Sequence, residues 1–268
     1  GSQKTEKAVP ETGLLPLGIA ASPPGRAISP LGTAVWKGYM LPPMLDPETQ
    51  KLWESYLTAE KDRIRDVTMP ALDRFVDSLL RLDPAVWQAW ARDFAAQVSD
   101  GTTDVPVRFP LFRRVLLPAL ADGVLHDVPG CARSLAHFES HLVNTKDVPL
   151  PEHLRSAVGL LQAAVRSDPG DRLARSRLVE RWGNYLDYTL HELPDGVLYG
   201  HNGATPEQCG ELLELLRDFR SHVAVLNREE EFAELIADCD LHFNSYREYL
   251  ARRQPGESYE SFLETRQT

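Results

Sequence analysis

Apolar residues recur at every third or fourth position through most of the chain after residue 46. In the segment 84–98, for example, Trp87, Trp90 and Phe94 fall on one helical face. The same spacing predicts helices over 47–66, 70–82, 84–98, 110–125, 130–144, 151–166, 169–193, 206–227 and 229–252, with a short helix near 259–263. Residues 105–107 and 197–199 could be extended, but they are too short to predict a sheet. The pattern predicts an all-α fold of about nine or ten helices, packed as antiparallel hairpins in a bundle or a short solenoid-like array.

Four of these helical segments follow an Asp-Pro or Thr-Pro pair. An Asp or Thr oxygen can accept the unpaired N–H groups of a first helical turn, and a proline there loses no hydrogen bond. We therefore expect helices to begin at Asp46-Pro47, Asp83-Pro84, Asp168-Pro169 and Thr205-Pro206. Pro118 lies inside the segment 110–125 and is expected to kink or split that helix.

The N-terminal segment has a different composition. Residues 1–47 hold eight of the 20 prolines and six of the 17 glycines, which favours extended chain over helix. From Leu14 to Leu45 the segment is nevertheless rich in apolar side chains. We expect residues 1–45 to dock in extended form on a single helical domain, residues 46–268, with a possible subdivision at the polar loop 100–109. The alternative is a tail that becomes ordered only on a partner.

Composition limits the compartment and the partners. The chain has 268 residues, of which 43% are hydrophobic and 25% charged, as in a folded globular protein. No apolar run approaches the roughly 20 residues that cross a bilayer, so we expect no membrane association. Cys131, Cys209 and Cys239 cannot all pair within one chain, which favours reduced thiols and a cytoplasmic location. A net charge of −10 would repel nucleic acid.

Negative charge is concentrated near the C-terminus. Residues 229–264 contain ten acidic and three basic side chains, and the acidic ones begin at the start of a predicted helix. A solvated helix face accounts for such a run, and so does a surface that meets a basic partner. In the second interpretation the partner-binding residues are Glu229, Glu230, Glu231, Glu234 and Asp238.

Candidate catalytic chemistry is sparse. Asp187 and His191 are four apart on a predicted helix, a spacing that suits either a carboxylate that orients an imidazole or an ordinary surface ion pair. The sequence has no Gly-x-Ser-x-Gly, no glycine-rich phosphate loop, no His-Glu-x-x-His and no Cys-x-x-Cys. His137 and His141 have the same spacing without an evident third ligand, so we expect no metal and no cofactor.

Two short resemblances carry no family assignment. Residues 164–169, followed by Ala174 and Leu178, resemble the junction between successive tetratricopeptide repeats, but the rest of that pattern does not recur at its 34-residue period. Arg217 and His222 match the Arg-x4–6-His pattern of helical RNA-cleaving domains of the HEPN type. Such a match is expected by chance in this composition, and the acidic balance disfavours an RNA substrate.

The sequence therefore favours a non-enzymatic protein–protein interaction module, such as a bacterial immunity protein that neutralises a toxin, or an adaptor. It would bind a basic protein partner through its acidic C-terminal helices. The alternative is an enzyme whose site lies in a helical cavity around Asp187 and His191. The sequence does not predict the oligomeric state.

Overall fold

The computed structural model describes residues 45–62, 64–145, 148, 150–193 and 205–266, and every regular element in these ranges is helical. The predicted all-α fold is confirmed. The elements in chain order are α1 (Pro47–Asp62), α2 (Arg65–Leu79), α3 (Pro84–Ser99), α4 (Phe109–Leu111), the π-helix η1 (Phe112–Leu116), α5 (Leu117–Leu125), α6 (Cys131–His137), α7 (Glu139–Leu142), the 3-10 helix η2 (Glu152–Leu154), α8 (Ala157–Ser167), α9 (Arg172–Glu192), α10 (Pro206–Leu226), α11 (Ala233–Arg252) and α12 (Tyr259–Arg266). The N-terminal segment that we expect to dock lies, up to residue 44, outside the described residues, as do residues 197–199.

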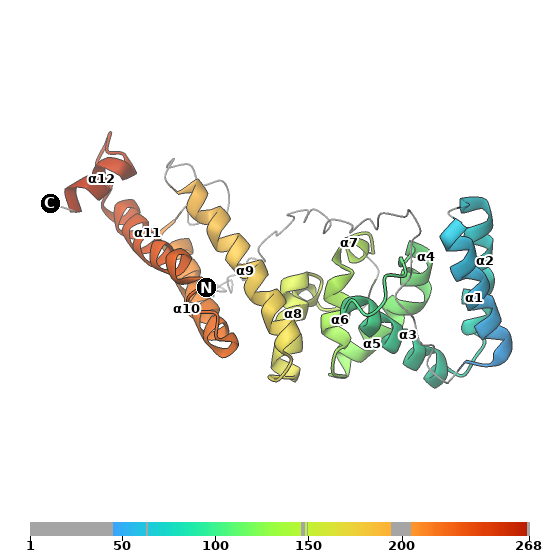
Figure 1. The fold of residues 1–268 in the computed structure, drawn as a ribbon. Helices are drawn as coiled ribbons and strands as arrows, with labels where there is room; N and C mark the ends of the chain where they lie inside the picture. The colour runs from blue at the N-terminus through green and yellow to red at the C-terminus, as the bar shows by residue number, and fades with distance from the viewer. Residues whose placement is uncertain (1–44, 63, 146–147, 149, 194–204, 267–268) are drawn as a thin grey trace, which may run out of the picture.

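The helices follow one another along an elongated array, with α1 and α2 at one end and α10, α11 and α12 at the other (Figure 1). Most packing joins helices that are close in sequence: α1 with α2, α5 with α6, α6 with α8, α8 with α9, and α10 with α11. Of the two predicted arrangements, this is the solenoid-like array, in which each helix pair buries its apolar face against its neighbours. None of the described helices is both long and apolar enough to cross a membrane.

Three of the four predicted helix starts are confirmed by their caps. Asp46 accepts hydrogen bonds from the backbone N–H groups of Glu48 and Thr49, at 3.0 and 3.1 Å. Asp83 accepts from Ala85 at 2.8 Å, and Thr205 accepts from Gln208 at 3.2 Å. Each cap satisfies an N–H group that the first turn of a helix leaves without a partner.

The predicted start at Asp168-Pro169 is wrong by three residues. Asp168 accepts from the Gly170 N–H at 2.9 Å and so closes a turn after α8. Asp171 is the cap of α9, because its carboxylate accepts from the Ala174 N–H at 2.9 Å. Both Asp168 and Asp171 could cap the helix. The Pro-Gly turn between them delays the start of α9, so Asp171 is the cap.

Other helices are interrupted where the sequence predicted continuity. The segment 130–144 breaks at Phe138, whose backbone angles (φ −95°, ψ 24°) separate α6 from α7. The segment 151–166 begins with η2, and α8 then starts afresh at Ser156, whose hydroxyl accepts from the Gly159 N–H. Pro118 has the predicted effect: the chain before it is π-helical, with the Leu117 N–H bonded to the Phe112 carbonyl five residues back.

Trp53 is the centre of an aromatic cluster in the first half of the array. Its ring lies 4.7 Å from Phe75 of α2 and 5.3 Å from Trp90 and Phe94 of α3, measured between centroids, and all four side chains are fully buried. The loop at which we placed a possible subdivision is tied back to α1 by an ion pair of Arg108 with Glu60, which is 4% exposed. The subdivision itself stays a prediction.

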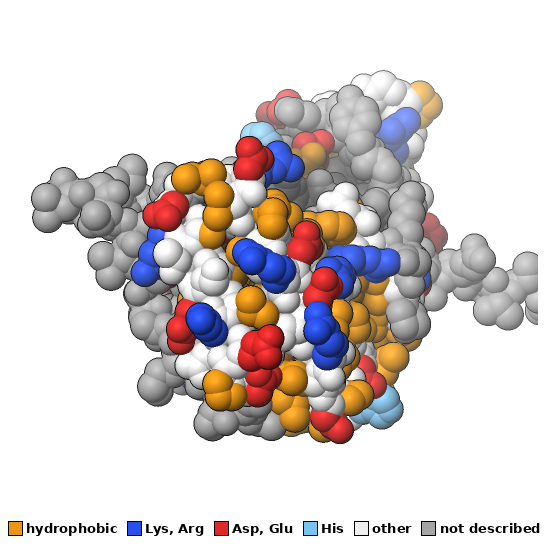
Figure 2. Space-filling view, turned by 90° about the vertical axis from the view of Figure 1, so that its right-hand side faces the viewer, with side chains coloured by type: hydrophobic (Ala, Val, Ile, Leu, Met, Phe, Trp, Pro, Cys, Tyr) orange, Lys and Arg blue, Asp and Glu red, His pale blue; other side chains and the backbone are white. Residues whose placement is uncertain are grey.

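The end of the array formed by α1 and α2 has a mixed surface. Figure 2 shows Lys and Arg side chains interspersed with Asp and Glu, and with scattered apolar groups between them. Acidic side chains on this face have basic neighbours, so no patch of a single sign forms.

Candidate functional site

The five predicted partner-binding carboxylates lie between α10 and α11 and on the first half of α11, and all five are exposed. Glu229, Glu230 and Glu231 occupy the connecting turn, whereas Glu234 and Asp238 are one helical turn apart on α11. The prediction of a helix from residue 229 is therefore wrong. Only Glu234 lies in the first turn of α11, where the helix macrodipole favours negative charge.

The turn has a clear physical cause. Asn227 adopts a left-handed conformation (φ 57°) that ends α10, and the Arg228 N–H bonds back to the Val223 carbonyl at 3.2 Å. Phe232 then packs its ring edge-on against Phe219 of α10, with centroids 5.2 Å apart. The left-handed cap and this apolar contact fix a tight connection in place of a continued helix.

Glu231 is neutralised within that turn. Its carboxylate accepts two hydrogen bonds from the Arg228 guanidinium, at 2.6 and 2.5 Å, and the same guanidinium lies 5.0 Å from the centroid of the Phe232 ring. These hydrogen bonds lower the pKa of Glu231 and raise the pKa of Arg228. Glu231 therefore has a local structural partner, and we remove it from the predicted interface.

Tertiary packing adds a carboxylate that we had assigned to a different site. Burial raises the pKa of the Cys239 thiol to about 12, and the negative charges of Asp238, Asp187 and Asp240 act in the same direction. Asp187 belongs to α9, so the charge near Cys239 comes from both sides of the α9–α11 contact. Asp240 faces α10 and pairs with Arg220, whereas Asp187 and Asp238 are exposed.

We call the resulting surface the acidic interface and define it by Asp187, Glu229, Glu230, Glu234 and Asp238. Within the described part of the chain, none of these five carboxylates has a Lys, Arg or His nitrogen within 4.0 Å. Asp187 and Asp238 lie near Cys239, whereas the α10–α11 turn lies against the first half of α9, where Arg228 reaches Ser176 and Glu180.

An exposed leucine lies within this surface. Leu241 is 53% exposed and follows Glu234 and Asp238 at helical spacing, so the three side chains share one face of α11. The sequence pattern did not single it out, because the apolar stripe of this helix is complete without it. Its solvent exposure is the feature that distinguishes it from the leucines of the core.

The pair proposed for the alternative enzyme is not enclosed. Asp187 and His191 are both exposed on α9, and no ion pair joins them. Three hollows among the described residues, beside α8, between α10 and α11, and beside α6 and α7, are lined by other side chains. Residues 194–204, which follow His191 closely, lie outside the described part of the chain.

The remaining histidine candidates are held by structural contacts. The break at Phe138 separates His137 from His141, and the His141 Nε2 lies 3.2 Å from the Val107 carbonyl. The described residues contain no group of three side chains that could hold a metal ion. Arg217 is exposed, whereas His222 lies against Trp182 with ring centroids 5.3 Å apart, so the two do not form a joint site.

Comparison with protein families, with curated proteins and with solved structures finds no match for this chain.

Proposed function

We propose that this protein is a non-enzymatic interaction module, of the immunity or adaptor type, that binds a basic protein partner through the acidic interface. The observation that carries the proposal is that Asp187 of α9 and Asp238 of α11 both lie close enough to Cys239 to act on its pKa, and that both are exposed and unpaired among the described residues, as is Glu234. A surface built from two helices and a turn is wide enough to contact a folded partner.

Uncompensated charge of one sign acts on association more than on folding. Carboxylates that repel one another gain most when a positively charged surface approaches, and this attraction raises the rate of encounter and rejects acidic partners. Leu241 would supply an apolar contact inside the charged region. A central apolar contact within a polar surround is the usual arrangement of a protein–protein interface.

The proposed compartment is the cytoplasm. Cys131, Cys209 and Cys239 are all buried thiols, which suits a reducing environment. We propose neither nucleic acid nor a membrane as a partner, because the acidic interface would repel phosphate groups.

The test replaces four interface carboxylates by their amides in one variant: Glu229→Gln, Glu230→Gln, Glu234→Gln and Asp238→Asn. Glu231 is kept because it holds the turn through Arg228. A matched control makes the same change in charge on α1 and α2, at exposed positions: Glu48→Gln, Glu54→Gln, Asp62→Asn and Asp66→Asn. Both variants should fold, since surface substitutions of this kind change stability by about 0.5 kcal/mol or less each.

Quantitative pull-down from a lysate of the source cells then compares the native protein with the two variants. A basic protein that is captured by the native chain and by the control variant, but lost with the interface variant, supports the proposal. Its capture should weaken as salt rises, because exposed charges are screened. Equal capture by all three proteins would show that the acidic interface is not the binding surface.

The enzyme alternative makes a different prediction. If Asp187 and His191 were catalytic, His191→Ala would abolish an activity, and the interface variant would keep it. In the interaction proposal His191→Ala leaves partner capture unchanged, since His191 is exposed and outside the five carboxylates.

A further inference from the structure

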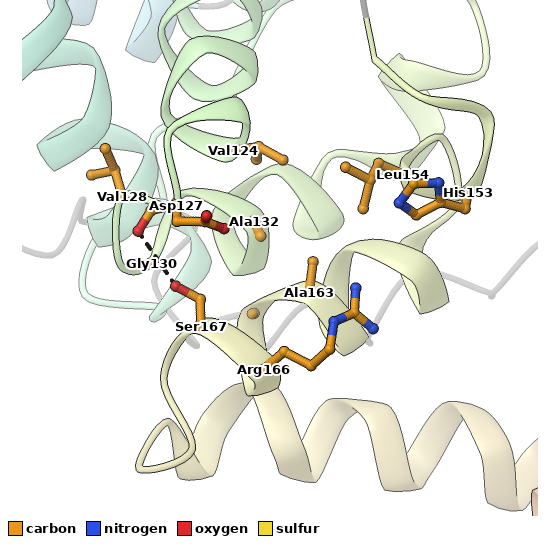
Figure 3. Close-up of a pocket in the computed structure, with 11 residues that line it drawn as sticks. Val124, Asp127, Val128, Gly130, Ala132, His153, Leu154, Ala163, Arg166 and Ser167 are labelled. Carbon is orange, nitrogen blue, oxygen red and sulfur yellow. Dashed lines mark hydrogen bonds between the residues drawn. The ribbon is translucent and has the colours of Figure 1, made fainter.

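A cavity of about 570 Å³ opens between the α5–α6 connection, η2 and α8, and none of its lining residues belongs to the acidic interface. Figure 3 shows its lining, which comes from three separate segments of the chain. Small-molecule sites in proteins commonly have volumes of about 300–1,000 Å³. The inference drawn from this cavity is independent of the proposed function.

The hollow exists because small residues face it. Gly130, Ala132, Ala163 and Ala164 line the space between the start of α6 and α8, where longer side chains would close it. Val124 and Leu154 are buried and give the floor an apolar character. The packing of α5 with α6, and of α6 with α8, fixes these walls.

The acidic and basic residues of the lining lie at opposite ends of the cavity. At one end Ser167, the last residue of α8, donates a hydrogen bond to the Asp127 carbonyl at 3.4 Å. At the other end the His153 carbonyl lies against Gly159 in the first turn of α8, only 1.7 Å from where a Cβ would be placed. Asp127 and His153 thus lie near opposite ends of α8.

Arg166 adds its charge to the His153 end. Side chains on a helix lean toward its N-terminus, and the Arg166 side chain runs from the end of α8 back toward Ala163, on the side where His153 lies (Figure 3). Figure 3 also shows Asp127 reaching toward the middle of the cavity from the opposite side. The cavity is therefore dipolar, with an acid at one end and a guanidinium and an imidazole at the other.

These three charged groups are exposed at the mouth of the cavity and are not used by the fold. Among the described residues, the side chains of Asp127, His153 and Arg166 make no hydrogen bond and no ion pair. Neighbouring charges are already paired: Asp122 with Arg92, and Glu152 with Arg155 at 3.6 Å. A ligand would not have to displace an internal partner in order to reach the three groups.

We propose that this cavity binds a short zwitterionic peptide. Its carboxylate would accept hydrogen bonds from Arg166, and from His153 when that ring donates, while its amine would pair with Asp127. An apolar side chain in the middle of the peptide would contact Val124 and Leu154. A guanidinium and a carboxylate at opposite ends select a ligand with both charges over a simple anion.

The length of the ligand follows from the helix. Gly159 and Ser167 are eight residues apart in α8, or about 12 Å along its axis, and Arg166 shortens this span by reaching back. An extended tripeptide covers about 10 Å. The geometry therefore favours a tripeptide over a free amino acid.

The experiment titrates the full chain with Ala-Leu-Ala, with its N-acetylated form and with its C-terminal amide, and measures binding by calorimetry. The unmodified tripeptide should bind saturably, and each modified form should bind about fivefold more weakly, because each leaves one charge contact with an exposed group unmade. Absence of saturation up to about 10 mM tripeptide would overturn the proposal. So would equal binding of either modified peptide.

Variants assign the contacts to residues. Arg166→Gln should abolish the preference for the free carboxylate, and Asp127→Asn should abolish the preference for the free amine. Asn keeps the positive φ of 53° accessible at that position. Arg252→Gln, at an exposed position of α11, is the matched control and should bind like the native chain.

Ala163→Leu should fill the cavity and eliminate binding of every peptide, with circular dichroism to confirm the fold. Binding that survives in Ala163→Leu, or a carboxylate preference that is unchanged in Arg166→Gln, would place the peptide elsewhere and contradict the assignment.

Discussion

Arg175 of α9 donates a hydrogen bond from Nη1 to Nδ1 of His222 in α10, at 2.8 Å. Arg175 as a whole is 8% exposed, and no carboxylate among the described residues pairs with its guanidinium, whose second hydrogen bond goes to the Pro169 carbonyl at 2.9 Å. A guanidinium can only donate, so Nδ1 of His222 must be unprotonated. Burial, reinforced by the charge of Arg175, lowers the pKa of His222.

This contact predicts a loss of stability in mild acid. A histidine whose pKa is lower in the folded state than in the unfolded state binds protons preferentially when unfolded, so stability falls as the pH drops below the unfolded value of about 6.5. Denaturant titrations at about pH 7.5 and about pH 5.5 should show this loss. The pKa of His137 is also lowered, first by burial and then by Arg177, and it contributes with the same sign.

His222→Asn should remove part of that dependence, because the Asn carbonyl can accept from Arg175 without titrating. The exposed His191, changed to Asn, is the control. A pH dependence that is identical in His222→Asn and in the native chain would show that the Arg175–His222 contact is not its source.

Two helical glycines should respond in opposite ways to alanine. A Cβ at Gly159 would lie 1.7 Å from the His153 carbonyl oxygen, whereas a Cβ at Gly210 would meet nothing within 4 Å. Gly159→Ala should therefore lower the free energy of unfolding by about 1–3 kcal/mol. Gly210→Ala should raise it by about 0.5–1 kcal/mol, because alanine is the better helix former. Thermal or urea unfolding measures both, and a stable Gly159→Ala would contradict the close approach of η2 to α8.

The two Asp residues before α9 should differ in importance. Asp171 caps the helix and also accepts from Arg133 Nε at 2.8 Å, with both side chains mostly buried. Asp171→Ala should cost about 2–3 kcal/mol, from a lost cap and a lost charged hydrogen bond. Asp168→Ala removes only an exposed turn contact and should cost about 1 kcal/mol or less. The reverse order in urea unfolding would support the helix start predicted from the sequence.

The sequence identified the features that depend on local chemistry. Helical periodicity and the caps at Asp46, Asp83 and Thr205 required no tertiary information, and neither did the effect of Pro118. Asp168 was preferred to Asp171 because the Asp-Pro pair is a strong local signal, and only the turn after α8 decides between them. The left-handed Asn227 ended α10 cleanly, but its consequence for residues 229–232 depended on the packing of Phe232 against Phe219.

In the candidate site, too, the sequence predicted what depends on neighbouring residues and missed what depends on tertiary contacts. The acidic run could be read directly, since its members are neighbours in sequence. That Glu231 is neutralised by Arg228, and that Asp187 joins the surface from α9, depends on contacts between distant segments. The apolar spacing could not predict that Leu241 is exposed. Each helix of a solenoid-like array packs against helices on two sides, and the spacing alone does not show which apolar side chains remain uncovered.

The three cysteines should be inert in the folded protein. Burial raises the pKa of Cys209 to about 11 and that of Cys239 to about 12, and it also raises the pKa of Cys131. The thiolate is the reactive form, so a thiol reagent at about pH 8 should label the native chain slowly and the denatured chain completely. Rapid labelling of Cys209 and Cys239 without denaturant would show that α10 and α11 open readily.

Leu241 allows the apolar and electrostatic parts of the proposed interface to be separated. Leu241→Gln should weaken capture of the basic partner by about 30-fold, the size of a central interface contact, and should leave folding within about 0.5 kcal/mol of the native value. Leu125→Gln, at a position of similar exposure (48% against 53%), is the matched control on α5.

The four-carboxylate variant should flatten the salt dependence of capture, whereas Leu241→Gln should weaken capture equally at every salt concentration, because it removes no charge. Binding kinetics at several salt concentrations measure both effects. If Leu241→Gln captures the partner as well as Leu125→Gln does, the outer face of α11 does not contact the partner, and the binding surface is confined to α9 and the α10–α11 turn.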